Sequence, residues 1–329
     1  MKKCIVTGGG GFVGKALCKE LLALGFEVHS IARGDYPELR RLGVKTHQGD
    51  LSEKGDWTKV FADTEAVFHT ASKVDMWGEL DDFYKVNVIG TRNVIEACTK
   101  HNVSILVYTS SPSVIADGTD ARGIDESKPY PVNHAAHYPA TKAQAEKLVL
   151  MQKDLKVVSL RPHLIWGPGD THLVPMILQR AKAGKLTQIG KGTNVVDVCF
   201  IDDCVQAHIC AYNKLSSNNW QKASGRAYFI SQDEPIKMWD WMNRIVTRSG
   251  LPPIKRKIPF KLAYSLATVS EYIAKIFGKK PALTRFLVSQ MATSHFFNID
   301  AAKNILGYRP KYSISQALDI TFGERSENF

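Results

Sequence analysis

A tyrosine and a lysine stand four residues apart in the segment Tyr138-Pro139-Ala140-Thr141-Lys142. On a helix, side chains at i and i+4 lie one above the other on the same face. An ammonium group beside a phenol stabilises the phenolate, which lowers the pKa of the phenol and makes it a competent acid. The pair predicts a proton donor for the oxygen of a carbonyl group whose carbon receives hydride, although this spacing alone also fits a surface pair.

Two serines, Ser110 and Ser111, directly follow the run Ile105 to Thr109, which is expected to be a strand. In a doubly wound sheet, ligands bind in the crevice at the carboxyl ends of the strands. A hydroxyl group at this position can hold the same substrate oxygen that the tyrosine protonates. The serines therefore strengthen the interpretation of the Tyr138/Lys142 pair as catalytic.

Glycines at positions 8, 11 and 14 lie between an expected strand and an expected helix. Residues without Cβ allow a sharp turn and let a pyrophosphate approach the amino terminus of the helix. A flexible loop is the alternative, but the strand before and the helix after favour a dinucleotide site. The predicted contacts are Gly8, Gly11, Phe12, Val13 and Gly14.

The end of the second expected strand reads Ser30-Ile31-Ala32-Arg33-Gly34, with no carboxylate before Asp35. A carboxylate here would accept from the ribose 2′-hydroxyl of NAD, whereas Arg33 can pair with the 2′-phosphate of NADP. The sequence thus favours NADP(H), with a solvated surface arginine as the alternative. Asp50, followed by Leu51, can accept from the adenine amino group or be an ordinary turn residue.

The elements that must position these groups alternate between short β-branched runs and amphipathic stretches. The expected strands are Lys3–Thr7, Glu27–Ala32, Val44–Gln48, Ala66–Thr70, Ile105–Thr109 and Lys156–Arg161, and the expected helices are Phe12–Leu24, Asp81–His101 and Tyr138–Lys153. Repeated strand-helix-strand units predict an α/β fold with a Rossmann doubly wound parallel sheet.

The rhythm changes after Arg161, where proline and glycine become frequent and strands such as Arg226–Ser231 are isolated. This pattern predicts an NADP-binding Rossmann domain over residues 1–161. Residues 162–329 are expected to form mainly a smaller substrate-binding domain, with some segments returning to the Rossmann sheet.

The composition excludes several classes of protein. With 329 residues and 44% hydrophobic residues, the chain can bury a large core, which excludes disordered and disulfide-stapled proteins. The start of the chain lacks the apolar core of a secretory signal, and no apolar run reaches the roughly 18 residues of a membrane span. Six cysteines without a C-x-x-C pair indicate reduced thiols and no metal site, so a cytoplasmic location is expected.

The net charge of +11 is unevenly distributed, because +7 of it lies between Lys255 and Arg285. Within this segment, apolar residues recur with spacings of 4, 3, 4 and 3, at Leu262, Leu266, Val269, Ile273 and Ile276. The spacing predicts one apolar stripe on a helix. The stripe either packs on the core or contacts a membrane surface or a partner. Nucleic acid is not expected, since no reader motif accompanies the charge.

Taken together, these motifs resemble the extended short-chain dehydrogenase/reductases over essentially the whole chain. The resemblance rests on Thr7 to Gly14, His69-Thr70-Ala71, Asn87-Val88-Ile89-Gly90-Thr91, Ser111 and the Tyr138/Lys142 pair. It implies Tyr138 as proton donor, Ser111 as partner of the substrate oxygen, and Lys142 as modulator of the tyrosine pKa and ligand of the nicotinamide ribose. It also implies cofactor contacts at Thr70, Ala71, Pro162 and His163.

Within that family, the substrate region differs from that of sugar-nucleotide epimerases, because Leu164 and Val196 stand where those enzymes carry polar nucleotide anchors. Apolar residues, among them Trp77 and Trp166 as expected substrate contacts, suit a long acyl chain or a sterol. The chain is similar to the 3β-hydroxysteroid dehydrogenase branch. Within it, the stretches 34–39, 109–114, 165–170 and 283–288 resemble bacterial 2-alkyl-3-oxoalkanoate reductases of long-chain olefin biosynthesis.

This resemblance implies NADPH-dependent reduction of a long-chain β-keto acid. The alternatives are a steroid or sterol dehydrogenase and a non-catalytic NADP-sensing protein. It also implies a homodimer formed by the helices Asp81–His101 and Tyr138–Lys153, and an assembly with other olefin-pathway enzymes. Together with the basic segment 255–285, it leaves open a location at the inner face of the membrane.

Overall fold

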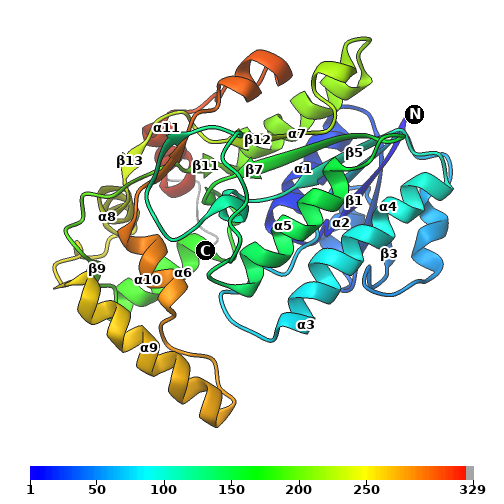
Figure 1. Cartoon of the computed structure of the whole chain (residues 1–329). Coiled ribbons are helices and arrows are strands. Elements are labelled where there is room, and N and C mark those ends of the chain that lie inside the picture. Colours follow the sequence, from blue (N-terminus) through cyan, green and yellow to red (C-terminus); the bar gives the residue numbers. More distant parts are fainter. Residues whose placement is uncertain (324–329) are drawn as a thin grey trace.

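A seven-stranded sheet forms the centre of the computed structural model, which describes residues 1–323 (Figure 1). All its strand pairs are parallel, in the order β12-β7-β5-β4-β1-β2-β3. The strands are β1 (Lys3–Thr7), β2 (Glu27–Ala32), β3 (Lys45–Gln48), β4 (Ala66–His69), β5 (Ile105–Thr109), β7 (Lys156–Pro162) and β12 (Arg226–Ile230). This order confirms the predicted doubly wound α/β fold.

Helices cover both faces of this sheet, so its central strands are apolar on both sides. In β1, for example, Cys4 and Val6 belong to one core and Ile5 to the other. Helices α1 (Phe12–Ala23) and α7 (Ile201–Ser216) pack together on one face, and α4 (Gly90–Lys100) and α5 (His137–Leu150) on the other. The expected helix Asp81–His101 consists of α3 (Leu80–Phe83), a π-helical turn and α4. The remaining helix of this half is α2 (Pro37–Arg41).

The second half of the chain builds smaller sheets beside the carboxyl ends of these strands. A four-stranded sheet has the order β13-β10-β15-β6, and two strand pairs, β8 with β11 and β9 with β14, lie next to it. Their bounds are β6 (Ala121–Ile124), β8 (Ile165–Trp166), β9 (Gln188–Ile189), β10 (Val195–Val196), β11 (Cys199–Phe200), β13 (Ile236–Lys237), β14 (Lys257–Ile258) and β15 (His295–Phe297). The helices are α6 (Leu173–Lys182), α8 (Met238–Arg248), α9 (Phe260–Phe277), α10 (Arg285–Ala292) and α11 (Ile314–Phe322).

Segments cross between the two halves in both directions. Strand β12 joins the edge of the large sheet beside β7. A segment from the C-terminal half is thus part of the Rossmann sheet, as expected. Conversely, β6 comes from the first 161 residues but pairs with β15 of the smaller sheet. The division at residue 161 remains a prediction, and β6 shows that the halves are interlocked.

The apolar stripe of the basic segment lies on α9 but does not pack on the core. Its five residues are between 48% and 61% exposed, while Ala263, Ala267 and Ala274 on another face are buried. Core packing of the stripe, one of the two expectations, is therefore wrong. Residues 1–323 contain no helix long and apolar enough to cross a bilayer.

Candidate active site

The first two turns of α5 carry the Tyr138/Lys142 pair. Lys142 is buried, and its Nζ donates a hydrogen bond of 2.6 Å to the backbone oxygen of Thr109 at the end of β5. The same ammonium lies 4.2 Å from the centre of the Tyr108 ring. Burial lowers the pKa of Lys142 to about 7, and the negative charge of Glu146 opposes that shift. Lys142 is thus fixed at the carboxyl end of β5 with a pKa near neutrality.

Glu146, one turn further along α5, is fully buried and accepts hydrogen bonds from three side chains. Arg161 approaches it with Nε at 3.1 Å and Nη2 at 2.6 Å, and the Ser159 and Tyr130 hydroxyls each donate at 2.6 Å. Hydrogen bonds and the charge of Arg161 lower the pKa of the Glu146 carboxyl, although burial opposes them. This ion pair ties α5 to β7. Nothing in local spacing links position 146 to position 161, so this pair was not predicted from the sequence.

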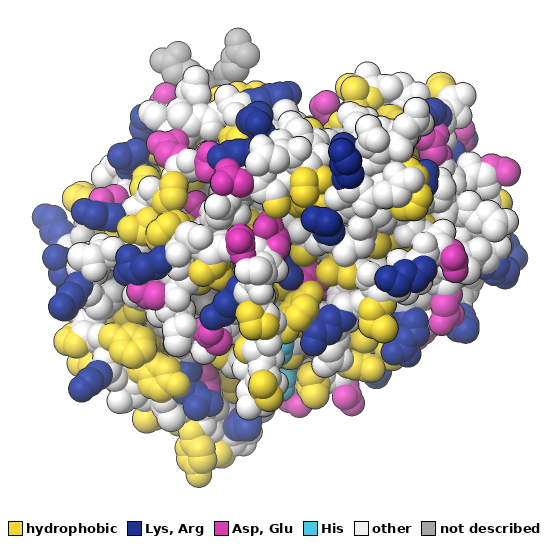
Figure 2. All heavy atoms as spheres, turned by 45° about the horizontal axis from the view of Figure 1, so that its top comes forward, with side chains coloured by type: hydrophobic (Ala, Val, Ile, Leu, Met, Phe, Trp, Pro, Cys, Tyr) yellow, Lys and Arg dark blue, Asp and Glu magenta, His cyan; other side chains and the backbone are white. Residues whose placement is uncertain are grey.

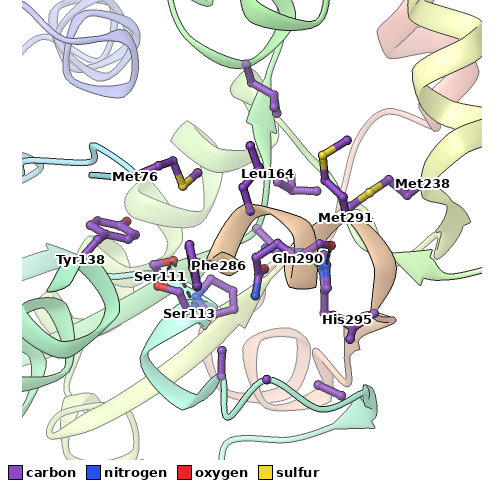
Figure 3. Close-up of a pocket in the computed structure, with 18 of the residues that line it drawn as sticks. Met76, Ser111, Ser113, Tyr138, Leu164, Met238, Phe286, Gln290, Met291 and His295 are labelled. Carbon is purple, nitrogen blue, oxygen red and sulfur yellow. Dashed lines mark hydrogen bonds between the residues drawn. The ribbon is translucent and has the colours of Figure 1, made fainter. Parts of the chain in front are cut away.

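Ser111 and Tyr138 both line one cavity and lie near each other on the same side of it (Figure 3). Ser111 begins the short turn Pro112–Ile115, and its Oγ accepts a 3.0 Å hydrogen bond from the Ser113 hydroxyl. Burial raises the pKa of Tyr138, and hydrogen bonding to Ser111 opposes that shift. The expected lowering of this pKa by Lys142 is not seen. Tyr138 is therefore protonated at neutral pH, as an acid must be, and Ser113 is an additional polar group.

The cavity beside this pair has a volume of about 230 Å³ and is lined mainly by apolar side chains. Figure 3 shows residues from distant parts of the chain converging on it, with Met76 near Tyr138, Leu164 in the middle, and Met238 and Met291 at the other side. Pockets of this kind bind largely apolar molecules and orient them by a few polar groups. The polar groups at the Tyr138 end are Ser111 and Ser113.

The glycine turn fits a dinucleotide pyrophosphate. Gly8 has φ +72°, and a Cβ on Gly14 would lie 2.3 Å from the Gly8 oxygen, so neither position has room for a side chain. Helix α1 starts at Phe12 and continues through Val13, and no side chain caps its amino terminus. Unbonded N–H groups at such a terminus bind anions.

At the end of β2, Arg33 is exposed and has no acidic partner among the described residues, whereas Asp35 is paired with Arg40. The first carboxylate after β2 is thus already bound. The Tyr36 ring lies against Gly10, where a Cβ would come within 2.1 Å of it. Sequence reasoning assigned no role to Tyr36, although its position shapes this side of the turn.

Asp50 forms a local turn after β3. Its Oδ1 accepts hydrogen bonds from the Ser52 backbone N–H at 2.8 Å and from the Ser52 hydroxyl at 2.7 Å. Leu51 is buried, and its backbone oxygen accepts from Asn93 of α4. Asp50 is thus a turn residue, which was one of its two expected roles. Its contact with the adenine amino group remains a proposal.

The segment after β4 is held against both the glycine turn and the catalytic helix. The Thr70 hydroxyl donates to the Thr7 oxygen at 2.8 Å, and a Cβ on Gly8 would lie 2.8 Å from the Cα of Ala71. Asn87 accepts from the Lys73 N–H at 2.8 Å and donates to the Thr141 hydroxyl at 3.1 Å. Asn87 thus ties the residues that directly follow Ala71 to α5, a role that its motif alone did not reveal.

Pro162 ends β7, and His163 follows it into the wall of the cavity. His163 Nε2 lies 2.6 Å from His295 Nδ1, and His295 Nε2 donates to the Gln290 oxygen at 2.8 Å. Because His295 Nε2 carries the proton that is donated to Gln290, the neutral His295 ring accepts at Nδ1. His163 Nε2 is therefore the donor to His295. Burial lowers the pKa of both imidazoles, so both are neutral at neutral pH.

The family model of the 3-beta hydroxysteroid dehydrogenase/isomerase family matches residues 5–262. The chain belongs to this family. Two curated bacterial relatives are named 2-alkyl-3-oxoalkanoate reductase. The one from Shewanella oneidensis is 43% identical over 95% of this chain and 84% of its own length. The one from Stenotrophomonas maltophilia is 42% identical over 96% of this chain and 97% of its own length. A mouse sterol-4-alpha-carboxylate 3-dehydrogenase is 35% identical over 97% of this chain and 90% of its own length.

As a member of the 3-beta hydroxysteroid dehydrogenase/isomerase family, the protein is an oxidoreductase, and a nicotinamide cofactor is typical of it. A structure of UDP-glucuronic acid 4-epimerase from Bacillus cereus in complex with NAD has a TM-score of 0.74 and 21% identity, with 97% of each chain covered. At this identity the likeness supports the fold alone.

In this family member, the two tryptophans expected to contact substrate do not line the cavity. Trp166 is fully buried, with its ring packed edge-on against Phe200 and Trp241. Trp77 is half-buried, and its neighbour Met76 lines the cavity instead. Contact of either tryptophan with substrate remains a proposal, and the buried position of Trp166 in the core does not favour it. Apolar residues near a site in sequence can belong to the core, and pairing of β8 with β11 turns Trp166 inward.

Proposed function

We propose that the protein uses NADPH to reduce the 3-keto group of 2-alkyl-3-oxoalkanoates to the 2-alkyl-3-hydroxyalkanoates of long-chain olefin biosynthesis. The observation that carries the proposal is the pairing of Ser111 and Tyr138 with a largely apolar cavity. A β-keto acid with two alkyl chains needs one polar end and a wide apolar remainder. The two relatives at 43% and 42% identity are named for this reaction.

The residues divide the chemistry between them. NADPH, when bound along the glycine turn, supplies a hydride for C3 of the substrate. Ser111 donates a hydrogen bond to the keto oxygen, and Tyr138 transfers its proton to that oxygen as the C=O bond becomes C–OH. Lys142 holds the nicotinamide ribose and, as an ammonium, stabilises the tyrosinate that remains. Thr70, Ala71, Pro162 and His163 border the nicotinamide end, and the remaining walls exclude water.

Because the pKa of Lys142 is about 7, its ammonium is present below that pH and is lost above it. We expect kcat/KM for NADPH to fall as pH rises through about 7, approaching tenfold per pH unit, since this parameter reports groups of the free enzyme. The measurement is a profile of initial rates at limiting NADPH. In Lys142→Arg, whose guanidinium stays charged, this decline should vanish. A wild-type profile that is flat up to pH 9 would refute the role of the ammonium.

The preference for NADP is assigned to Arg33, because the neighbouring Asp35 is occupied by Arg40. Arg33→Gln should raise KM for NADPH by about 10- to 100-fold, the worth of one charge-assisted hydrogen bond, and leave KM for NADH nearly unchanged. Arg92→Gln, at an exposed arginine on α4, is the control. Equal losses with both cofactors would show that Arg33 does not bind the 2′-phosphate.

Comparing substrates tests the proposed function. Wild-type protein is assayed by NADPH oxidation with a series of 2-alkyl-3-oxo acids and by NAD reduction with a 3β-hydroxysteroid. We expect turnover of the keto acids and little of the steroid. A clear preference for the steroid with NAD would replace the proposal by the sterol dehydrogenase alternative. Tight NADPH binding without turnover of any substrate would favour the NADP-sensing alternative.

The remaining proposals concern partners and location. We propose a homodimer in which α4 and α5 pack against their copies, and an assembly with other enzymes of the olefin pathway. We also propose a cytoplasmic location with contact between residues 255–285 and the inner face of the membrane.

A further inference from the structure

Helix α9 carries an exposed apolar surface, which we call the α9 face, made of Leu262, Leu266, Val269, Ile273 and Ile276. These side chains are 48–61% exposed and fall within one narrow stripe at helical spacing. The face turned to the body of the protein is made instead by small residues, Ala263, Ala267 and Ala274. A contiguous apolar stripe in solvent marks an interaction surface.

The surroundings of the α9 face are strongly cationic. Lys261 and Lys275 flank it, Lys279 and Lys280 follow its end, and Lys255, Arg256 and Lys257 precede it, all of them exposed. Glu271 is the one acidic residue of the segment, and it is turned inward and bound to the backbone N–H and the Nε of Arg285 at 2.6 and 2.7 Å. Figure 2 shows these hydrophobic side chains at the lower left, with Lys and Arg side chains around them. The occupant must therefore be apolar and anionic.

A lipid bilayer meets both requirements better than a second copy of the chain. Apolar side chains of an interfacial helix enter the acyl region, while lysines beside them reach the anionic headgroups. Two copies joined through this face would bring the same cationic rims together. The helix is also well placed for a flat surface, because it lies at the outer edge of the molecule and its carboxyl end projects beyond it (Figure 1).

A second cavity lies between α9 and the cavity beside Tyr138. It has a volume of about 340 Å³, lies beneath the amino-terminal half of α9, and is lined there by Ile258 and Ala263. It shares Arg180, Leu186 and Met291 with the cavity beside Tyr138. An acyl chain that leaves a bilayer at α9 would enter this second cavity, which borders the cavity of the reacting groups.

We propose that the α9 face docks the protein on an anionic lipid bilayer, from which a lipid-like substrate enters through the second cavity. The docking stands on the α9 face and its charges, and the identity of the substrate rests on the proposed function.

Sedimentation with vesicles tests the docking without any substrate. Wild-type protein should bind vesicles of phosphatidylglycerol and phosphatidylcholine at least about tenfold more strongly than vesicles of phosphatidylcholine alone. The double variant Leu266→Glu/Ile273→Glu, at solvent-exposed positions, should lose this binding with an unchanged circular dichroism spectrum. Val132→Glu, which replaces a 96% exposed apolar residue on the loop between β6 and α5, is the matched control and should bind as wild type does.

Each other outcome overturns the proposal. The proposal that the α9 face binds a bilayer would be refuted by wild-type protein that does not bind anionic vesicles. It would also be refuted by a double variant that binds them as wild type does. A double variant that dissociates an oligomer in analytical ultracentrifugation and leaves vesicle binding intact would assign the face to a protein partner.

The same double variant separates docking from catalysis. With a short, water-soluble 2-alkyl-3-oxo acid, its turnover should equal that of wild type, whereas turnover of a long-chain substrate embedded in anionic vesicles should fall about tenfold or more. Equal turnover of the embedded substrate would contradict delivery from the bilayer. Because vesicle binding is measured without substrate, a failure of the reductase assay would count against the proposed function and leave the docking result intact.

Discussion

Tyr138→Phe is expected to reduce kcat for the β-keto acid by about 10³- to 10⁴-fold, because the variant keeps the ring and loses the acid. A positioned general acid contributes up to about 10⁴-fold, and no other described side chain that lines the cavity near Ser111 is a phenol. Affinity for NADPH, measured by quenching of protein fluorescence, should change little, since the glycine turn and Arg33 are untouched.

The matched control for this prediction is Tyr130→Phe. That tyrosine donates to Glu146 from outside the cavity, so its loss removes one hydrogen bond of a buried network and not the proposed acid. We expect its kcat to stay within about tenfold of wild type. Tyr138→Phe with a rate like that of wild type would contradict the assignment of the acid.

Glu146→Gln is expected to have the largest effect on stability. The substitution leaves the buried Arg161 guanidinium without its charge partner, and such a loss costs about 3–5 kcal/mol of the free energy of unfolding. It also removes the charge that supports the Lys142 ammonium, so the pKa of Lys142 should fall further below its present value of about 7. Urea denaturation measures the first effect, and the pH profile for NADPH measures the second.

A double variant distinguishes the ion pair from simple packing. Glu146→Leu/Arg161→Met replaces both charges by apolar side chains, which often costs little compared with breaking the pair. It should therefore be more stable than Glu146→Gln. A loss below about 1 kcal/mol in Glu146→Gln would show that the pair is not needed for stability.

The sequence predicted the parts of the molecule that depend on local chemistry. Continuous β-branched runs identified the central strands, because a parallel sheet is buried on both faces. Glycine spacing identified the cofactor turn, since neither Gly8 nor Gly14 has room for a side chain. The i, i+4 relation placed Tyr138 and Lys142 on one face of α5.

Features that depend on long-range contacts were not predictable in this way. The pair of Glu146 and Arg161 forms because α5 packs on β7, and the burial of Trp166 depends on Trp241, which is 75 positions further along. Periodicity identified the stripe of α9 as one face of a helix, but it could not tell whether another element covers that face. The pKa of Tyr138 is set by burial, which a sequence does not display.

The central claim is that this chain directs hydride from NADPH to C3 of a β-keto acid. The most direct measurement uses NADPH carrying deuterium on one face of nicotinamide C4, with a 2-alkyl-3-oxo acid, and mass spectrometry of the product. The account predicts that one of the two labelled forms gives 2-alkyl-3-hydroxy acid with a single deuterium at C3, and that Tyr138→Phe gives almost none. Product without deuterium from either form, or no hydroxy acid from the wild-type protein, would contradict it.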